Sequence, residues 1–199
     1  MERSNNILNN EQHIGMSITE KYNKIRSSIK HGDTILFHGE KIISNIINTA
    51  DNSYWNHIGI ILEVSGVLFI IDSNAGGVQP ERLSVRIKSY EDHNGDFKIR
   101  RSTKPIENIN TALYNVMQNL EDTGVVKYDF INGAKSLANR FFKTKFKIKE
   151  KANVKICSMF VKPYEVELDM IFNRITPDSL FFPQDFERYE KNVNHICNL

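Results

Sequence analysis

The chain has 199 residues, of which 40% are hydrophobic and 25% charged, a composition typical of one soluble domain. Its formal net charge of +2 is too small to predict binding to nucleic acid or to an anionic membrane surface. Two cysteines, Cys157 and Cys197, are too few for a disulfide framework. The polar N-terminus lacks the apolar core of a secretory signal, and no apolar run approaches the about 20 residues that span a bilayer. We therefore expect a cytoplasmic protein with no stable membrane insertion.

Three parts of the chain are distinguished by their patterning. We expect residues 1–17 to be a flexible N-terminal lead-in, residues 18–190 a single domain and residues 191–199 a C-terminal tail. Apolar residues at helical spacing predict helices at 18–29, 41–49, 107–121, 131–142 and 156–165. Ser17 or Thr19 is placed to cap the first helix, and Gly32 lies just past its end.

Strands are expected in the middle of the chain. Apolar and β-branched runs between turn residues predict strands at 34–38, 57–64, 67–73, 81–89 and 96–101. Ser65-Gly66 is typical of a two-residue hairpin turn, and residues 75–80 form a Gly-rich turn. Short capped turns are expected at 176–178 and 183–185. Strands clustered between helices predict an α+β fold with an antiparallel sheet.

Cys157 is a candidate nucleophile because it stands at the start of an apolar-periodic helix. Thiol catalysis needs a thiolate, a base that holds the proton and donors for the developing oxyanion. The free N–H groups of a first helical turn favour a negative charge and supply such donors. The alternative is a buried cysteine that acts as a small hydrophobic residue.

His57 is a candidate general base because it begins the strand 57–64, at the rim of the predicted sheet. The alternative is a structural histidine. A third polar group should orient its imidazole. If Val64 pairs with Val67 across the hairpin, Asp72 faces Gly59 and lies one diagonal step from His57. Diagonal neighbours lie about 7–8 Å apart, within reach of two polar side chains.

Other third residues stay open at this point. Asn74 would face the histidine directly and is a rival to Asp72, and the carboxylates of Glu63 and Glu81 are further alternatives. No cluster of His, Cys and Asp has the spacing of metal ligands, so we expect neither a metal nor another cofactor.

Five segments of the chain together resemble a known family. They are GDTILF at 32–37, WNHIGI at 55–60, YDF at 128–130, KICSMFV at 155–161 and ITPDSL at 175–180. In that order they resemble the GD-I-F opening, the S-H-V-G-I strand, the YDF element, the C-S-E-L-V helix and the TPDDL element of permuted NlpC-type, papain-like cysteine hydrolases. The YiiX-like branch is the most similar. The chain departs from these motifs at Asn56, where a small residue is usual, and at Met159, where an acidic residue is common.

The resemblance implies a circularly permuted papain-like fold, in which a small antiparallel sheet or barrel packs against helices. It implies that residues 18–190 are a catalytic domain and that base, third residue and nucleophile follow one another along the chain. It also implies a hydroxyl group in an oxyanion hole beside the Cys157 backbone N–H. The residues concerned are His57, Asp72 and Cys157 for catalysis, and Tyr54, Tyr128 and Ser158 for the oxyanion or the substrate.

We therefore expect a cysteine hydrolase that cleaves an amide bond, in a peptide or isopeptide, or an ester bond through a thioester intermediate. The expected substrate is a small peptide, an amino-acid-containing molecule or an acyl compound. One alternative is a lipid acyltransferase of the lecithin:retinol acyltransferase-like type, for which the apolar and then basic segment 131–149 is the candidate membrane contact. The other is a non-catalytic binding module on the same fold.

Overall fold

The protein is built on one six-stranded sheet. The computed structural model describes residues 15–39, 54–74, 77–123, 157–172 and 182–196. The strands are β1 (Thr34–His38), β2 (His57–Val64), β3 (Val67–Asn74), β4 (Gly77–Arg82), β5 (Asp96–Ser102) and β6 (Val193–Ile196). Their order is β4-β3-β2-β1-β5-β6, and each neighbouring pair is antiparallel. Among the described residues the sheet is open. Of the two expected forms, a small antiparallel sheet or a barrel, the structure therefore has the first.

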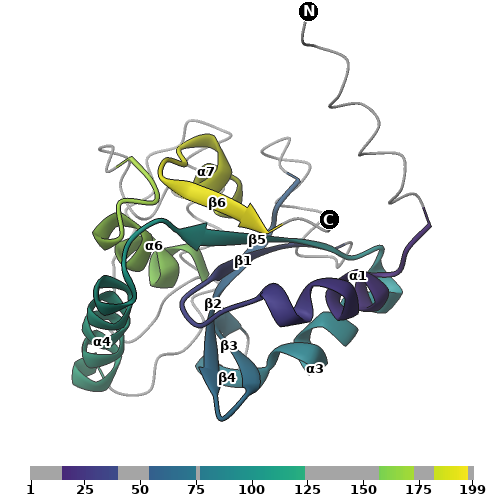
Figure 1. Ribbon diagram of the computed structural model, residues 1–199, viewed down its shortest axis with the longest axis horizontal. Helices are drawn as coiled ribbons and strands as arrows, with labels where there is room; N and C mark the ends of the chain where they lie inside the picture. The colour runs from purple at the N-terminus through teal and green to yellow at the C-terminus, as the bar shows by residue number, and fades with distance from the viewer. Residues whose placement is uncertain (1–14, 40–53, 75–76, 124–156, 173–181, 197–199) are drawn as a thin grey trace, which may run out of the picture.

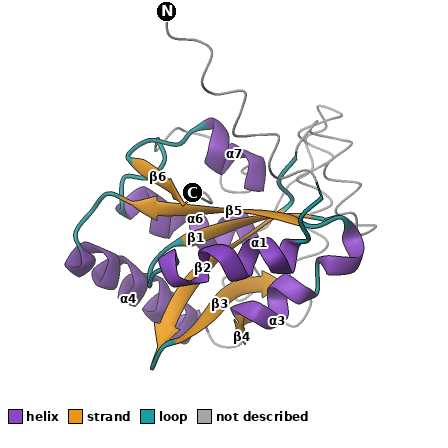
Figure 2. Ribbon diagram, turned by 45° about the vertical axis from the view of Figure 1, so that its right-hand side comes forward, coloured by secondary structure: helices purple, strands orange, loops and turns teal. Residues whose placement is uncertain are grey.

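Helices cover both faces of this sheet. They are α1 (Ile18–Ile25), the 3₁₀ turn η2 (Arg26–Ser28), α3 (Leu83–Lys88), the 3₁₀ turn η3 (Glu91–His93), α4 (Ile106–Thr123), α6 (Cys157–Glu167) and α7 (Pro183–Arg188). Figure 1 shows α4 and α6 on one side of the sheet and α1 and α3 on the other. The turned view in Figure 2 shows α1 lying across its face of the sheet. This arrangement confirms the predicted α+β class.

The two faces have separate cores because side chains alternate along each strand. Ile58 and Ile60 pack with α4 and α6, whereas Ile61 and Ile70 pack with α1 and α3. No described helix is both long enough and apolar enough to cross a membrane.

The start of the domain follows the sequence closely. Ser17 caps α1 in a capping box, in which its Oγ accepts from the Glu20 N–H at 3.2 Å and Glu20 Oε2 accepts from the Ser17 N–H at 2.9 Å. The α-helix ends at Ile25 and continues as η2, a few residues before the predicted end. Gly32 has φ +84°, and a Cβ there would lie 2.2 Å from Ile109. This position therefore requires glycine.

The hairpin between β2 and β3 also has its predicted form. Ser65 and Gly66 have φ values of 51° and 76°, as a two-residue turn of type I′ requires. Val64 then pairs with Val67, and Gly59 pairs with Asp72. The turn thus fixes which residues of the two strands face each other at the far end of the hairpin.

Residues 77–89 differ from the prediction. The expected turn at 75–80 is replaced from residue 77 by the strand β4, and the expected strand at 81–89 contains the helix α3. Leu83, Val85 and Ile87 alternate in the sequence, which is typical of a strand. In the structure Leu83 and Ile87, four residues apart, are buried, and Val85 is 50% exposed. The burial has the period of a helix, and the hydrophobic character of Val85 misled the prediction.

The later elements bear on the site directly. Helix α4 covers the predicted segment 107–121, and α6 begins at Cys157 and ends at Glu167, so it continues slightly beyond its predicted end. Helix α7 begins at Pro183, where a capped turn was expected. Strand β6 lies within the segment assigned to the tail and pairs with β5. The helices predicted at 41–49 and 131–142 and the turn at 176–178 fall outside the described residues.

Candidate active site

His57 and Asp72 meet at the end of the sheet. Nε2 of His57 lies 2.7 Å from Oδ2 of Asp72. The contact follows from the hairpin register, which places Asp72 opposite Gly59 and therefore diagonal to His57 on one face. The Asp72 side chain is fully buried and that of His57 is 14% exposed. The structure thus brings together the two residues that the register predicted to be within reach.

The other candidates for the third residue lie around this pair or away from it. Nδ2 of Asn74 donates to Oδ1 of Asp72 at 3.2 Å and so supports the carboxylate. The carboxylate of Glu81 lies 3.1 Å from Nε of Arg86. Glu63 is exposed near the turn, at the opposite end of β2 from His57. Asp72 is accordingly the carboxylate that binds the imidazole.

Arg86 is a site residue that the sequence analysis missed. Its Nη2 donates to Oδ1 of Asp72 at 3.0 Å, and its side chain is 15% exposed. It extends from α3 on the face of the sheet that His57 and Asp72 share with Ile61 and Ile70. Because residues 81–89 were assigned to a strand, no contact between Arg86 and the end of β3 was expected. The helical spacing of Leu83 and Ile87 was the signal that pointed to it.

Tyr90 is a second residue that was missed. It follows α3 and is 7% exposed, and its ring stacks on Phe37 with centroids 4.7 Å apart and planes 10° apart. The Phe37 ring lies 6.2 Å from the His57 ring. A Cβ at Gly39 would come within 2.6 Å of the Tyr90 ring, so this glycine allows the close approach. Tyr90 therefore forms part of the wall around His57.

Cys157 is the first residue of α6 and is buried, with a free thiol. It packs in the core on the face of the sheet that α4 and α6 cover. The alternation of side chains along β2 and β3 directs His57 and Asp72 to the opposite face. The charge of Cys157 nevertheless acts on the imidazole of His57, which is the first residue of β2. Burial alone would lower the pKa of His57, but the charges of Tyr90 and Cys157, together with the hydrogen bond and charge of Asp72, raise it well above its ordinary value.

The pKa of Asp72 is displaced in the opposite direction. Burial favours the neutral acid and raises this pKa, but the hydrogen bond and charge of His57 lower it. The charge of Arg86 and the hydrogen bond from Asn74 act in the same sense, and the net pKa lies below its ordinary value. The site therefore favours an ionised aspartate beside a protonated imidazole.

The oxyanion candidates have different surroundings. Ser158 is fully buried beside Cys157, and its hydroxyl has no hydrogen-bond partner within the described part of the chain. The Tyr54 hydroxyl donates to Oδ2 of Asp96 at 3.1 Å, and its ring stacks on His38 at 4.1 Å. Burial, and then the charge and hydrogen bond of Asp96, raise the pKa of Tyr54. This structure thus directs the Tyr54 hydroxyl to Asp96. Tyr128 lies outside the described residues.

The segment that leads into His57 is held by α7. Oε1 of Gln184 accepts the backbone N–H groups of Tyr54 at 2.9 Å and of Trp55 at 3.1 Å. The Asn56 side chain donates to the carbonyl of Gly39 at 3.0 Å. Asn56, which departs from the family motif, is therefore part of the support of the strand start.

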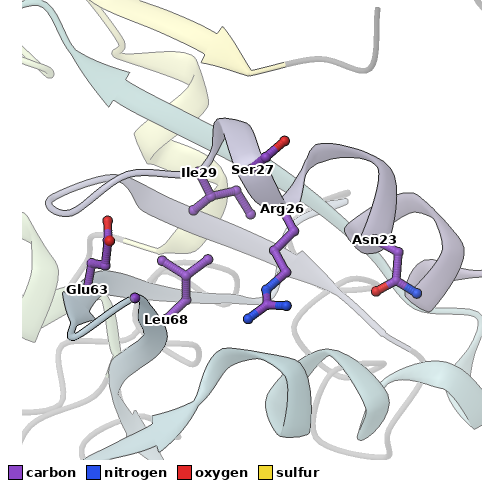
Figure 3. Close-up of a pocket in the computed structure, with 7 residues that line it drawn as sticks. Asn23, Arg26, Ser27, Ile29, Glu63 and Leu68 are labelled. Carbon is purple, nitrogen blue, oxygen red and sulfur yellow. The ribbon is translucent and has the colours of Figure 1, made fainter.

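The surroundings offer two further observations on possible ligands. Among the residues that the structure describes, no group of three or more His, Cys, Asp and Glu side chains is arranged to hold a metal ion. A pocket of about 430 Å³ lies between the end of α1 and the β2–β3 hairpin (Figure 3). Arg26, Glu63 and Leu68 are among its lining residues, so it lies at the opposite end of β2 from His57.

Comparison with known proteins gives a structural similarity but no match to a family model or to a curated sequence. Among solved structures, the chain is similar to the crystal structure of the metalloprotein yiiX (DUF1105) from Escherichia coli O157:H7. The TM-score is 0.49 and the identity 12%, over 85% of this chain and 97% of that one. The roles of the site residues therefore rest on the geometry of this chain alone.

Proposed function

We propose that this chain is a cysteine hydrolase of the permuted papain-like, YiiX-like type that cleaves an amide or ester bond. The observation that carries the proposal is the hydrogen bond of 2.7 Å between His57 and the buried Asp72, next to a cysteine at a helix start whose charge acts on that imidazole. The pKa of His57 is raised well above its ordinary value, so the imidazole is held protonated and can give its proton to a leaving group.

The reaction proceeds in two halves. The Cys157 thiolate attacks the carbonyl carbon, and the His57 imidazolium gives its proton to the leaving amine or alkoxide as the C–N or C–O bond breaks. A thioester on Cys157 results. His57, now neutral, takes a proton from the water that attacks the thioester, and the carboxylic acid leaves as the Cys157 thiolate and the imidazolium are restored. Backbone N–H groups at the start of α6 and the Ser158 hydroxyl are the candidate donors to the oxyanion.

The order of the three residues supports the assignment to a permuted type. Base, orienting carboxylate and nucleophile follow one another as His57, Asp72 and Cys157. The first two lie at the end of the β2–β3 hairpin and the third at the start of α6.

Trapping of an acyl-enzyme tests this function. We would incubate the protein with panels of activated esters, peptide amides and isopeptides and measure its intact mass. The expected result is an acyl adduct at Cys157 that neutral hydroxylamine removes. Cys197→Ser is the matched control, because it removes the other thiol of the chain and should keep the adduct. Inclusion of a chelator throughout separates thiol chemistry from metal chemistry.

The outcomes distinguish the alternatives. Release of the free acid supports a hydrolase, whereas transfer of the acyl group to an added amine or alcohol acceptor indicates an acyltransferase. Absence of an adduct from every panel, or an adduct that survives in Cys157→Ser, would contradict the thiol mechanism. Absence of any adduct would favour a non-catalytic binding module.

A further inference from the structure

Arg86 links the orienting carboxylate of the candidate site to a second anion. The two oxygens of Asp72 have different partners: Oδ2 contacts His57 at 2.7 Å, and Oδ1 accepts from Arg86 at 3.0 Å and from Asn74 at 3.2 Å. On its other side, Nε of Arg86 lies 3.1 Å from a carboxylate oxygen of Glu81. The charges alternate from Glu81 through Arg86 and Asp72 to the imidazole.

The backbone that carries Arg86 is fixed by packing. Leu83 and Ile87, on either side of it in α3, are both fully buried in the core beneath the helix. The carbonyl of Arg86 accepts from the Ser89 hydroxyl at 2.8 Å, which ties down the end of the helix. The guanidinium therefore approaches Asp72 from a backbone that packing holds in place.

We propose that Arg86 is a positioning residue, whose guanidinium fixes the orientation in which Asp72 accepts the His57 hydrogen bond and offsets part of the negative charge that the imidazole experiences. This inference rests on the proposed function in treating His57 as the base. The guanidinium keeps Asp72 ionised in a fully buried place, and it limits how strongly Asp72 holds the proton on His57.

Other groups also act on the imidazole, and the effect of Arg86 must be separated from theirs. Asp72 contacts it directly, Cys157 approaches from α6, and Tyr90 approaches from the turn after α3. All three groups remain in the chain when Arg86 is replaced, and what is lost is the positive charge that acts on the imidazole directly and through Asp72 and Tyr90. A change in the His57 pKa on replacement of Arg86 alone therefore reports the guanidinium.

The test is an NMR titration of the His57 imidazole in the full chain, with His57→Gln used to assign the signal. In Arg86→Gln, which keeps a hydrogen-bond donor and removes the charge, we expect the His57 pKa to rise by about 0.5–1 pH unit. Arg82→Gln is the matched control, because it makes the same charge change four residues earlier at an exposed position. We expect it to shift the His57 pKa by less than about 0.2 pH unit.

A His57 pKa in Arg86→Gln that equals the wild-type value, or that moves no more than in Arg82→Gln, overturns the inference. If Arg86→Gln does not fold, Glu81→Gln serves instead, since Glu81 is partly exposed. Loss of the Glu81 charge leaves Arg86 balanced by Asp72 alone, so the His57 pKa should fall. An unchanged or higher value contradicts the proposal. The titration needs no substrate, so a chain without hydrolase activity would overturn the proposed function and leave this result standing.

Discussion

The carboxylate of Asp72 is fully buried, and it stays ionised there because three side chains satisfy it: His57, Asn74 and Arg86. Removal of a charge partner from a buried pair costs more than the pair contributes, since the remaining charge is left without solvent. At the scale of single residues, Asp72 is therefore both the orienting group of the candidate site and part of the stability of this end of the sheet.

Replacement of Asp72 by Asn should lower the free energy of unfolding by about 3 kcal/mol or more, because His57 and Arg86 lose their buried counter-charge. The pKa of His57 is raised on folding, so its contribution is fully present below about pH 6.5 and is lost as pH rises through the raised value. The pKa of Asp72 is lowered, so its contribution is present above about pH 4 and is lost as pH falls. The difference in unfolding free energy between wild type and Asp72→Asn, measured by urea denaturation, should therefore be largest between about pH 4 and pH 6.5. A difference that is constant from pH 3 to 9 would contradict the linkage.

At the scale of elements, the sequence predicted those features that depend on residues close together in the chain, such as a turn and the strand register that it sets. The turn at Ser65-Gly66 needs a positive φ at both positions, and this local requirement set the register that brings Asp72 to His57. The prediction of a strand at 81–89 was wrong because the pattern is ambiguous. Leu83, Val85 and Ile87 alternate as in a strand, but in the structure α3 packs against α1 and the sheet and leaves Val85 exposed. The contact of Arg86 with Asp72 was missed for the same reason, because it depends on that helix.

Truncation of these three apolar residues tests the helical assignment. Leu83→Ala and Ile87→Ala each remove a fully buried side chain and should cost about 2–4 kcal/mol of unfolding free energy. Val85→Ala changes a side chain that is 50% exposed and should cost less than about 0.5 kcal/mol. Urea denaturation midpoints give the three values. Equal losses at all three positions would favour a strand and contradict α3.

At the scale of the whole molecule, the two halves of the candidate site come from different layers. His57 and Asp72 belong to the sheet and Cys157 to α6, so their relation depends on how α6 is fixed to the sheet. Near the other end of α6 the buried Glu165 pairs with the buried Arg100 of β5 and accepts from the Thr34 hydroxyl of β1 at 2.7 Å. This buried ion pair had no sequence signal, because it joins residues 65 positions apart.

Glu165→Gln removes the buried carboxylate that pairs with Arg100 and leaves only the more distant, partly exposed Glu190, 3.5 Å from Nε, so it should destabilise the fold by about 3 kcal/mol. If the pair holds α6 in place, the variant should also react more slowly at Cys157 under conditions where it remains folded. Thermal unfolding followed by circular dichroism, together with alkylation below the transition, measures both effects. Arg101→Gln is a useful comparison, because it breaks an ion pair with Asp33 that does not involve α6. Equal stability of Glu165→Gln and wild type would contradict the role of the pair.

The central claim is that His57 activates Cys157, and the pH dependence of alkylation tests it most directly. In a Cys197→Ser background, iodoacetamide reports Cys157 alone. The account predicts that at pH 6 Cys157 reacts at least about tenfold faster than N-acetylcysteine, and that His57→Ala removes this advantage. Alkylation no faster than that of the free thiol across pH 5–9, with no change in His57→Ala, would contradict it.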